Sequence, residues 1–209
     1  MKIKAYLAGG IFTYGDELRN REWAAKLREA FPEMELYSPI ENTDINGIEG
    51  KKKFAGSKEI EAADNARLDD TDILIACIDG DVLPSGTCAE IGIMREKIRR
   101  GEKKYIVGIC TDNRECSRTH SEAKDNGGAA DICESQYSYQ NLYVVGCIKS
   151  SGILVNNIDD AIKFIKTLPL GRQHKIKSVH KIYVPSLDCF KIMTVYEDGA
   201  IEYSEEEHD

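Results

Sequence analysis

The feature that most constrains the fold is a nearly continuous apolar run at residues 72–78, Asp-Ile-Leu-Ile-Ala-Cys-Ile. A strand that is apolar on both faces is typical of a parallel sheet with helices on either side. Strand-like and helix-like stretches alternate along the chain at residues 2–8, 16–31, 34–37, 58–68, 72–78, 87–100 and 104–109. This alternation predicts an α/β fold of the Rossmann-like or flavodoxin-like kind, with a parallel sheet and helices on both faces.

The pattern continues after a polar segment at residues 111–131. Leu142–Val145 and Ile153–Val155 are predicted as one or two further strands, and a helix at 159–168 follows them. Pro169 and Gly171 indicate where that helix ends. We therefore predict a first domain at residues 1–170.

The remaining residues, 171–209, differ in pattern. They contain two stretches of alternating hydrophobicity and a turn at Asp198-Gly199 before a third short stretch. These signals predict a small C-terminal β appendage, which ends in an acidic, disordered tail at residues 205–209.

Composition excludes several classes of function. The formal charge of −8 argues against a duplex nucleic-acid partner, because binding to phosphates requires a basic surface. No apolar run approaches the roughly 18 residues that cross a bilayer, which predicts no membrane association. The chain begins directly with a predicted strand and shows no apolar signal segment, so we expect a cytoplasmic location. The expected partner is a small molecule.

The seven cysteines are odd in number and scattered, which fits reduced thiols better than a disulfide framework. Cys110, Cys116, His120 and Cys133 form the one conceivable zinc cluster, but their spacing is irregular and no CxxC pair occurs. We predict neither a metal nor a cofactor.

Glu90 is the leading candidate for a catalytic residue. It lies in Pro-Ser-Gly-Thr-Cys-Ala-Glu-Ile-Gly at residues 84–92, after the apolar strand, and α/β sheets bind ligands beyond the carboxyl ends of their strands. Ser85, Gly86 and Thr87 offer capping oxygens and a flexible backbone at a predicted helix start. In the alternative interpretation, Glu90 only complements the helix dipole.

Asp64 is the second candidate. It falls eight residues before Asp72, on the turn that leads into the same strand, so it and Glu90 are predicted to flank one cleft. Paired carboxylates suit substitution at an anomeric carbon, because the oxocarbenium-like transition state is positively charged. In the alternative interpretation, Asp64 belongs with Asp69, Asp70 and Asp72 to a solvated acidic edge.

The first predicted strand runs into Gly9-Gly10-Ile11-Phe12. Two glycines let the backbone approach a bound molecule, and the Phe12 ring is suited to cover an aromatic base. The sequence is neither GxGxxG nor GxxxxGK[ST], which argues against a dinucleotide or ATP site. In the long loop at residues 38–57, Glu41 and Asn42 are candidates to reach the edge of a base.

Three separated blocks resemble the nucleoside 2-deoxyribosyltransferase family. They are Tyr-Leu-Ala-Gly-Gly-Ile-Phe at residues 6–12, the Asp64–Asp72 spacing, and Ile-Asp-Gly at 78–80 followed by SGTxxEIG at 85–92. The resemblance covers about residues 1–165. It implies an enzyme in which the glutamate of SGTxxEIG attacks C1′ of a 2′-deoxynucleoside and forms a covalent deoxyribosyl-enzyme. A second base, or water in the hydrolase branch, then takes the sugar.

The resemblance also implies roles for individual residues. Glu90 is the nucleophile, and Asp64 positions the sugar or handles the proton of the leaving base. The implied substrate-binding residues are Gly9, Gly10 and Phe12 around the base and sugar, and Asp79, Gly80, Ser85 and Gly86 around the ribose 5′ side. A symmetric homo-oligomer, with pockets completed across subunits, is likewise implied.

The chain departs from the family pattern at Pro84. Members that act on free nucleosides usually carry an aspartate there, which contacts the 5′-hydroxyl, and proline offers no such hydrogen bond. Ser85 and Thr87 would instead suit a 5′-phosphate. Two nearby acids, Asp79 and Asp81, and the absence of Lys or Arg in residues 68–94 favour a free nucleoside.

The sequence leaves the nucleophile and the exact reaction open. Asp131-Ile132-Cys133 stands where relatives often have Asn-Leu-Met, so that segment receives no role. Cys88 is a second possible nucleophile, although no histidine precedes His120 to activate it. The predicted reaction is transfer between nucleobases. Hydrolysis of deoxynucleosides or their 5′-monophosphates, and a non-catalytic nucleotide sensor, are the competing interpretations.

Overall fold

The computed structural model describes residues 2–42, 55–112, 132–133, 140–169, 176–184, 189–196 and 201–205. The chain divides into two compact units, Lys2–Thr167 and Leu168–Asp209.

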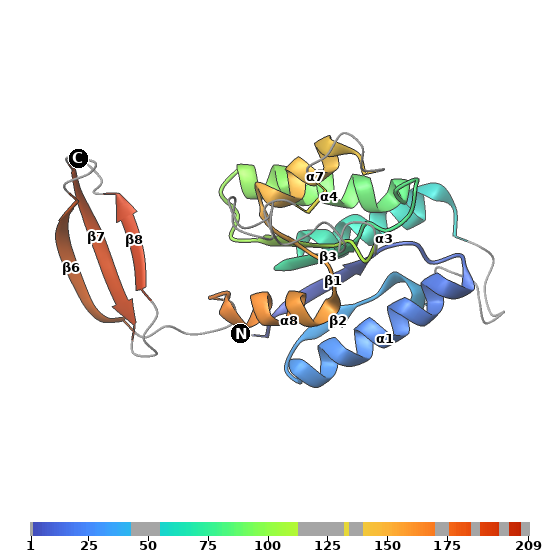
Figure 1. The fold of residues 1–209 in the computed structure, drawn as a ribbon, viewed down its shortest axis with the longest axis horizontal. Coiled ribbons are helices and arrows are strands. Elements are labelled where there is room, and N and C mark those ends of the chain that lie inside the picture. Colours follow the sequence, from blue (N-terminus) through green and yellow to red (C-terminus); the bar gives the residue numbers. More distant parts are fainter. Residues whose placement is uncertain are drawn as a thin grey trace. The chain divides into compact units, whose positions relative to one another are not determined.

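The larger unit is built on a five-stranded sheet with the strand order β2-β1-β3-β4-β5 (Figure 1). Every neighbouring pair of strands is parallel. The strands are β1 (Lys4–Ala8), β2 (Glu35–Tyr37), β3 (Ile73–Cys77), β4 (Tyr105–Ile109) and β5 (Gly152–Val155). This topology confirms the predicted parallel α/β fold.

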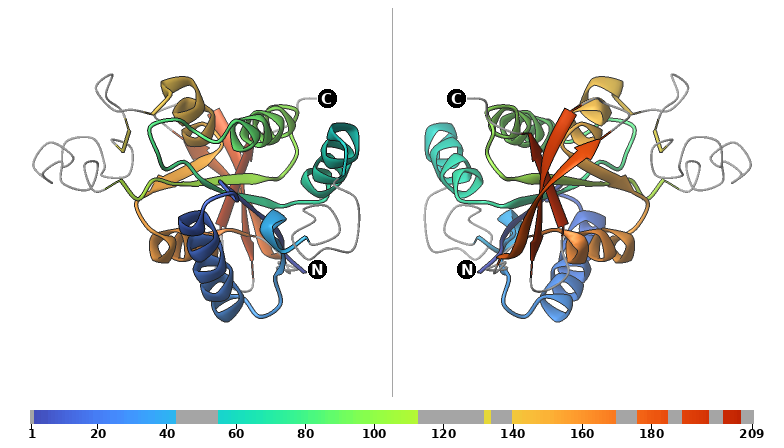
Figure 2. Two further views of the ribbon diagram at one scale, coloured as in Figure 1. Left: turned by 90° about the vertical axis from the view of Figure 1, so that its right-hand side faces the viewer. Right: turned by 90° about the vertical axis from the view of Figure 1, so that its left-hand side faces the viewer.

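Helices cover both faces of the sheet, as Figure 2 shows. Helices α1 and α8 lie on one face, and α3, α4 and α7 lie on the other. Their bounds are α1 (Tyr14–Ala30), α3 (Ser57–Asp69), α4 (Ser85–Arg99), α7 (Leu142–Lys149) and α8 (Ile158–Thr167), with a 3-10 turn η1 (Pro39–Glu41) after β2. No helix in the described ranges has both the length and the apolar character to span a membrane.

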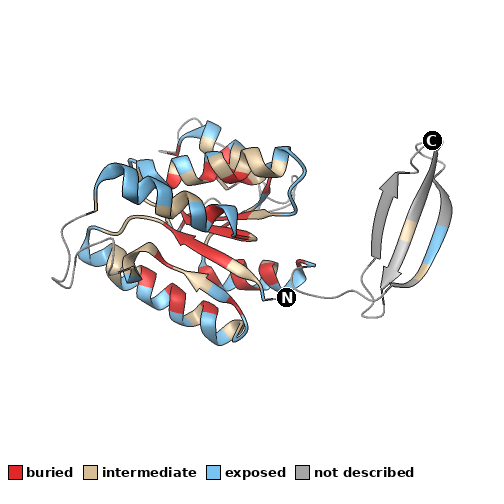
Figure 3. Ribbon diagram, turned by 180° about the vertical axis from the view of Figure 1, so that it is seen from behind, coloured by how far each residue is buried: buried red, intermediate tan, exposed pale blue. Residues whose placement is uncertain are grey.

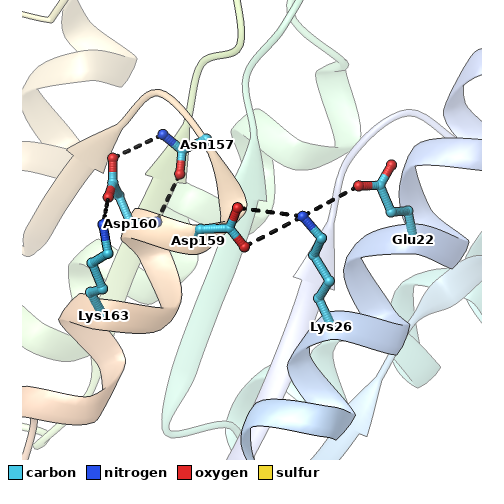
Figure 4. Close-up of polar contacts among 6 residues, drawn as sticks. All are labelled: Glu22, Lys26, Asn157, Asp159, Asp160 and Lys163. Atoms are coloured by element: carbon cyan, nitrogen blue, oxygen red, sulfur yellow. Dashed lines mark hydrogen bonds and ion pairs between the residues drawn. The ribbon is translucent and has the colours of Figure 1, made fainter.

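A side-chain contact ties the two helices of the first face together. Lys26 of α1 places its Nζ 3.4 Å from the Asp159 carboxylate of α8 and 3.5 Å from Glu22 (Figure 4). Asn157 precedes α8 and accepts a hydrogen bond from the Asp160 amide at 2.8 Å, which satisfies an N–H at the helix start. The exposed ion pairs add little stability, so packing carries this face.

The core consists of the strands and the inner faces of these helices (Figure 3). All residues of β3 are buried, as its apolar run predicts. Tyr6, Leu74 and Ala76 pack on the same side of the sheet as Ile91 and Met94 of α4. Trp23 of α1 is 5% exposed and belongs to this core.

The prediction of a strand at Leu142–Val145 is wrong, because these residues open helix α7. Asn141 caps this helix by accepting hydrogen bonds from the amides of Tyr143 and Val144 at 3.0 and 3.4 Å. Val145 and Ile148, three residues apart, then lie buried on one face. The cap and this spacing override the β-propensity of the run. The strand predicted at 153–155 is confirmed as β5.

The smaller unit contains an antiparallel sheet with the strand order β6-β7-β8. These strands are β6 (Ile176–Val184), β7 (Cys189–Tyr196) and β8 (Ile201–Glu205). The predicted C-terminal β appendage is thereby confirmed. Glu205, predicted to begin the disordered tail, is the last residue of β8, and residues 206–209 lie outside the described residues.

Candidate active site

Glu90 and Asp64 come from different helices and act on the same phenol, Tyr6. Tyr6 lies in the middle of β1, and its ring is fully buried. Its Oη donates a hydrogen bond to Glu90 Oε1 at 2.7 Å. The charge of Asp64 acts on both groups, because it raises the pKa of the Tyr6 phenol and that of Glu90. The structure therefore brings together the two acids that the sequence places at one cleft.

The prediction that Asp64 lies on a turn is wrong, because it lies inside helix α3. That helix ends at Asp69, near the amino ends of the strands. At 1.5 Å per residue, Asp64 lies about 8 Å back along the helix, toward the carboxyl ends of the strands. Tyr37, the last residue of β2, lies at that end of the sheet, and its Oη is 3.4 Å from Asp64 Oδ1.

The solvated acidic edge is separate from the site. Lys4 binds Asp72 through its backbone amide at 2.8 Å and Asp70 through its ammonium group. Lys97 Nζ lies 2.7 Å from Asp69. These three acids are thus bound to lysines at the amino ends of the strands, and they do not share the environment of the carboxylate on α3.

The environment destabilises the charged forms of both acids. Burial raises the pKa of Glu90, the Tyr6 hydrogen bond opposes this rise, and the charge of Asp64 adds to it. Burial also raises the pKa of Asp64, against the hydrogen bond from Tyr37, which lowers it. Burial and the Glu90 charge raise the pKa of Tyr6 far above its usual value, so this phenol keeps its proton and stays a donor. Carboxylates perturbed in this way are typical of reactive sites.

The loop after β1 is held by the first turns of α1. The Gly10 carbonyl accepts hydrogen bonds from Arg19 Nη2 at 3.0 Å and Asn20 Nδ2 at 2.9 Å. A Cβ on Gly10 would lie 2.7 Å from Asp16 Oδ1, and one on Gly9 would lie 3.3 Å from Arg19 Nη2. A side chain at Gly10 would thus force the Asp16 carboxylate to move, whereas at Gly9 the neighbours would have to shift by only a few tenths of an ångström.

The other residues predicted to bind substrate lie in the loops after β1 and β3. Phe12 is 95% exposed, so its ring is free to cover a ligand. Asp79 accepts hydrogen bonds from the amide and hydroxyl of Thr111 at 2.5 and 2.7 Å, which joins the loops after β3 and β4. Gly80 has φ of 97°, a conformation that favours glycine.

Helix α4 begins at Ser85, two residues earlier than predicted, with Pro84 in the capping position. The expectation that Ser85 and Thr87 supply capping oxygens is wrong. Pro84 occupies the N-cap position, and no side chain caps the helix. Ser85 and Gly86 are exposed, whereas Thr87 is 3% exposed. The first turn carries no acidic side chain, and its exposed start is open to an anionic or oxygen-rich group.

The two competing interpretations of the site are a Cys88 nucleophile and a zinc cluster. Burial and the Glu90 charge raise the pKa of Cys88, which disfavours a thiolate nucleophile there. Within the described ranges, no three side chains are grouped to hold a metal ion, while Cys116 and His120 lie outside those ranges. Surface grooves of about 600 and 510 Å³ flank α4, and neither is lined by Glu90 or Asp64.

Residues 5–157 match the family model described as nucleoside 2-deoxyribosyltransferase. The chain belongs to this family. The protein UU063 of Ureaplasma parvum serovar 3 is 36% identical over 115 residues, which cover 51% of this chain and 70% of that protein. The family resemblance seen in the sequence is thereby confirmed.

Solved structures of similar fold include two proteins described as 2-deoxyribosyltransferases. A conserved protein from Enterococcus faecalis V583 has 32% identity and a TM-score of 0.64, covering 79% of this chain and 98% of its own. The 2-deoxyribosyltransferase of Bacillus psychrosaccharolyticus has 16% identity and a TM-score of 0.52, covering 77% and 91%. That of Leishmania mexicana has 17% identity and a TM-score of 0.52, covering 80% and 99%. The last two share the fold of this family.

Sequence reasoning missed the tyrosines that hold the acids of this deoxyribosyltransferase-family site. Tyr6 and Tyr37 are partners in the register of β1 and β2, so their side chains leave the same face of the sheet. A signal for Tyr6 was present, because a tyrosine inside a buried strand needs a partner for its hydroxyl. Glu41, a candidate for the base edge, instead binds Arg28 through both oxygens at 2.9 and 2.6 Å.

Proposed function

We propose that this protein cleaves the N-glycosidic bond of 2′-deoxynucleosides and transfers the sugar to another nucleobase. The Glu90 carboxylate attacks C1′, and the C1′–N bond breaks with its electron pair moving to the base. Asp64 positions the sugar or supplies the proton that the leaving base takes up. A second base then bonds to C1′ and releases the carboxylate of Glu90.

The observation that carries this proposal is the 2.7 Å hydrogen bond from Tyr6 to Glu90, a carboxylate close enough to Asp64 for the Asp64 charge to raise its pKa. The bond holds Oε1, which leaves Oε2 for C1′. Because Tyr6 keeps its proton, it favours the ionised nucleophile. Two carboxylates at this point also stabilise the positive charge that develops on the sugar.

The predicted substrate contacts complete the proposal. Phe12 covers the base, and the backbone at Gly9 and Gly10 borders the base and sugar. The ribose 5′ side lies near Asp79, Gly80, Ser85 and Gly86. Since Thr111 already occupies both oxygens of Asp79, this aspartate acts in the proposal by fixing the loop and its backbone groups.

Hydrolysis is the second candidate, either of deoxynucleosides or of their 5′-monophosphates. A 5′-monophosphate substrate is favoured by Pro84, which leaves this position at the start of α4 without a carboxylate that would repel a phosphate. Incubation with and without an acceptor base separates the reactions. Deoxyribose that accumulates regardless of acceptor indicates hydrolysis, and a new nucleoside indicates transfer.

The direct test is mass spectrometry of the intact protein after brief mixing with a deoxynucleoside or a 2′-fluorinated analogue. We expect an adduct of the sugar's mass on Glu90, absent from Glu90→Gln and retained in Glu96→Gln. Glu96 is a matched control because it is an exposed-face glutamate of the same helix, bound to Arg99 and Arg100. A protein that binds the nucleoside equally well as wild type and as Glu90→Ala, and that forms no adduct and cleaves nothing, would be a non-catalytic nucleotide sensor.

The proposal includes a cytoplasmic homo-oligomer, as the family resemblance implies. Light scattering of the purified protein should give a mass that is a multiple of 23.4 kDa. A monomer that is fully active would contradict a pocket completed across subunits.

A further inference from the structure

Tyr37 is held rigidly beside Asp64 by contacts on its ring. Its centroid lies 5.0 Å from that of Tyr6, with 56° between the rings. The Arg67 guanidinium lies 5.1 Å from the Tyr37 ring centroid. Aromatic packing and a cation–π contact therefore fix the ring between β1 and α3.

The hydroxyl of Tyr37 has a defined direction. Asn42 Nδ2 donates a hydrogen bond to Tyr37 Oη at 3.1 Å, so that oxygen already serves as an acceptor. The phenol has one proton, and Asp64 Oδ1 lies 3.4 Å away to accept it. This length is common for catalytic hydrogen bonds in ligand-free sites, which tighten when substrate binds.

Arg67 follows Asp64 by three residues on α3, a spacing at which acid and base usually form an ion pair. Its guanidinium instead stacks on Tyr37. The groups that face Asp64 are thus Tyr6 from β1, Tyr37 from β2 and Glu90 from α4. Two phenol–carboxylate pairs, Tyr6 with Glu90 and Tyr37 with Asp64, lie next to each other.

We propose that Tyr37, clamped by Asn42 and Arg67, is the positioning residue of Asp64. It holds Oδ1 and leaves Oδ2 directed at the substrate. The catalytic consequence rests on the proposed function, whereas the hydrogen bond that positions Asp64 does not. Tyr37 acts only through Asp64 and touches no reacting atom.

The first test needs no activity. A ¹³C NMR titration follows the Asp64 carboxyl, assigned by its loss in Asp64→Asn, in the wild type and in Tyr37→Phe. We expect Tyr37→Phe to move the titration midpoint to higher pH, because the lost hydrogen bond favoured the ionised form. Tyr105→Phe is the control, since Tyr105 is a partly buried strand tyrosine at the amino end of β4. An unchanged midpoint in Tyr37→Phe overturns the proposal.

The second test is a double-mutant cycle on glycosidic cleavage. We expect Tyr37→Phe to lower kcat about tenfold with little change in KM, the effect of one hydrogen bond to a charged group. In an Asp64→Asn background the same change should have no further effect. Multiplying losses would overturn the proposal. If the wild type cleaves nothing, the proposed function fails, and the titration still decides the positioning role.

Discussion

Replacing Tyr6 with phenylalanine removes one hydroxyl from a fully buried ring and tests how Glu90 is kept ionised. The lost bond is 2.7 Å long and joins a neutral donor to a carboxylate. Hydrogen bonds to charged groups contribute about 1.5–3 kcal/mol, and each 1.36 kcal/mol corresponds to about one pH unit. Burial already raises the pKa of Glu90, and the Tyr6 hydrogen bond lowers it, so loss of this bond raises the pKa further.

The rate should follow from the sign of that change. The nucleophile must be ionised, so activity falls on the acid side of the Glu90 pKa. In Tyr6→Phe the acid limb of the profile should move to higher pH by about one to two units, from the energies above. At a fixed pH on that limb, the loss in kcat/KM is then about 10- to 100-fold, and it shrinks toward the alkaline plateau.

The assay is chromatography of the released base between pH 4 and 9, for the wild type, Tyr6→Phe and the control Tyr105→Phe. Melting curves at each pH show which points come from folded protein. A profile of Tyr6→Phe that is lowered equally at every pH would refute the reasoning, because the hydroxyl would then not act through the charge of Glu90.

Three further predictions concern stability and the competing nucleophile. Glu90→Gln should abolish the adduct yet raise the free energy of unfolding at pH 7 by about 0.5–2 kcal/mol in thermal melts. The reason is that a carboxyl group with a raised pKa in the folded state destabilises that state as the pH rises from the unfolded to the folded pKa, so the gain should vanish at low pH. Gly10→Ala should lower the free energy of unfolding by about 1–3 kcal/mol in urea melts, because the added Cβ would lie 2.7 Å from the Asp16 carboxylate. Gly92→Ala is the control: its Cβ would meet no described atom beyond its own helix backbone within 4 Å, and a glycine-to-alanine change inside a helix should raise the free energy of unfolding by about 0.5–1 kcal/mol. Cys88→Ala should keep most of its activity in the base-release assay, and a complete loss would revive the thiol as nucleophile.

The fold was predictable because its signals are local. The apolar run of β3 and the alternation of strands with helices determine a parallel sheet. At Leu142–Val145 the local signal was ambiguous, and the Asn141 cap decided for a helix. Glu90 and Asp64 were found through spacing and resemblance, whereas the environment that makes them reactive comes from residues far away in the sequence. Tyr6 lies 84 residues from Glu90, a separation that no local pattern encodes.

Strand register links the fold to the chemistry of the site. Tyr6 and Tyr37 are register partners in β1 and β2, and both leave the sheet on the side of α3 and α4. Because side chains alternate along a strand, a slip of one residue would turn one of these phenols to the opposite face. The acid paired with that phenol would then lose its donor, and Glu90 and Asp64 would remain as two repelling, partly buried acids. The register of the two strands therefore determines which carboxylate oxygens are held and which are left to face a sugar.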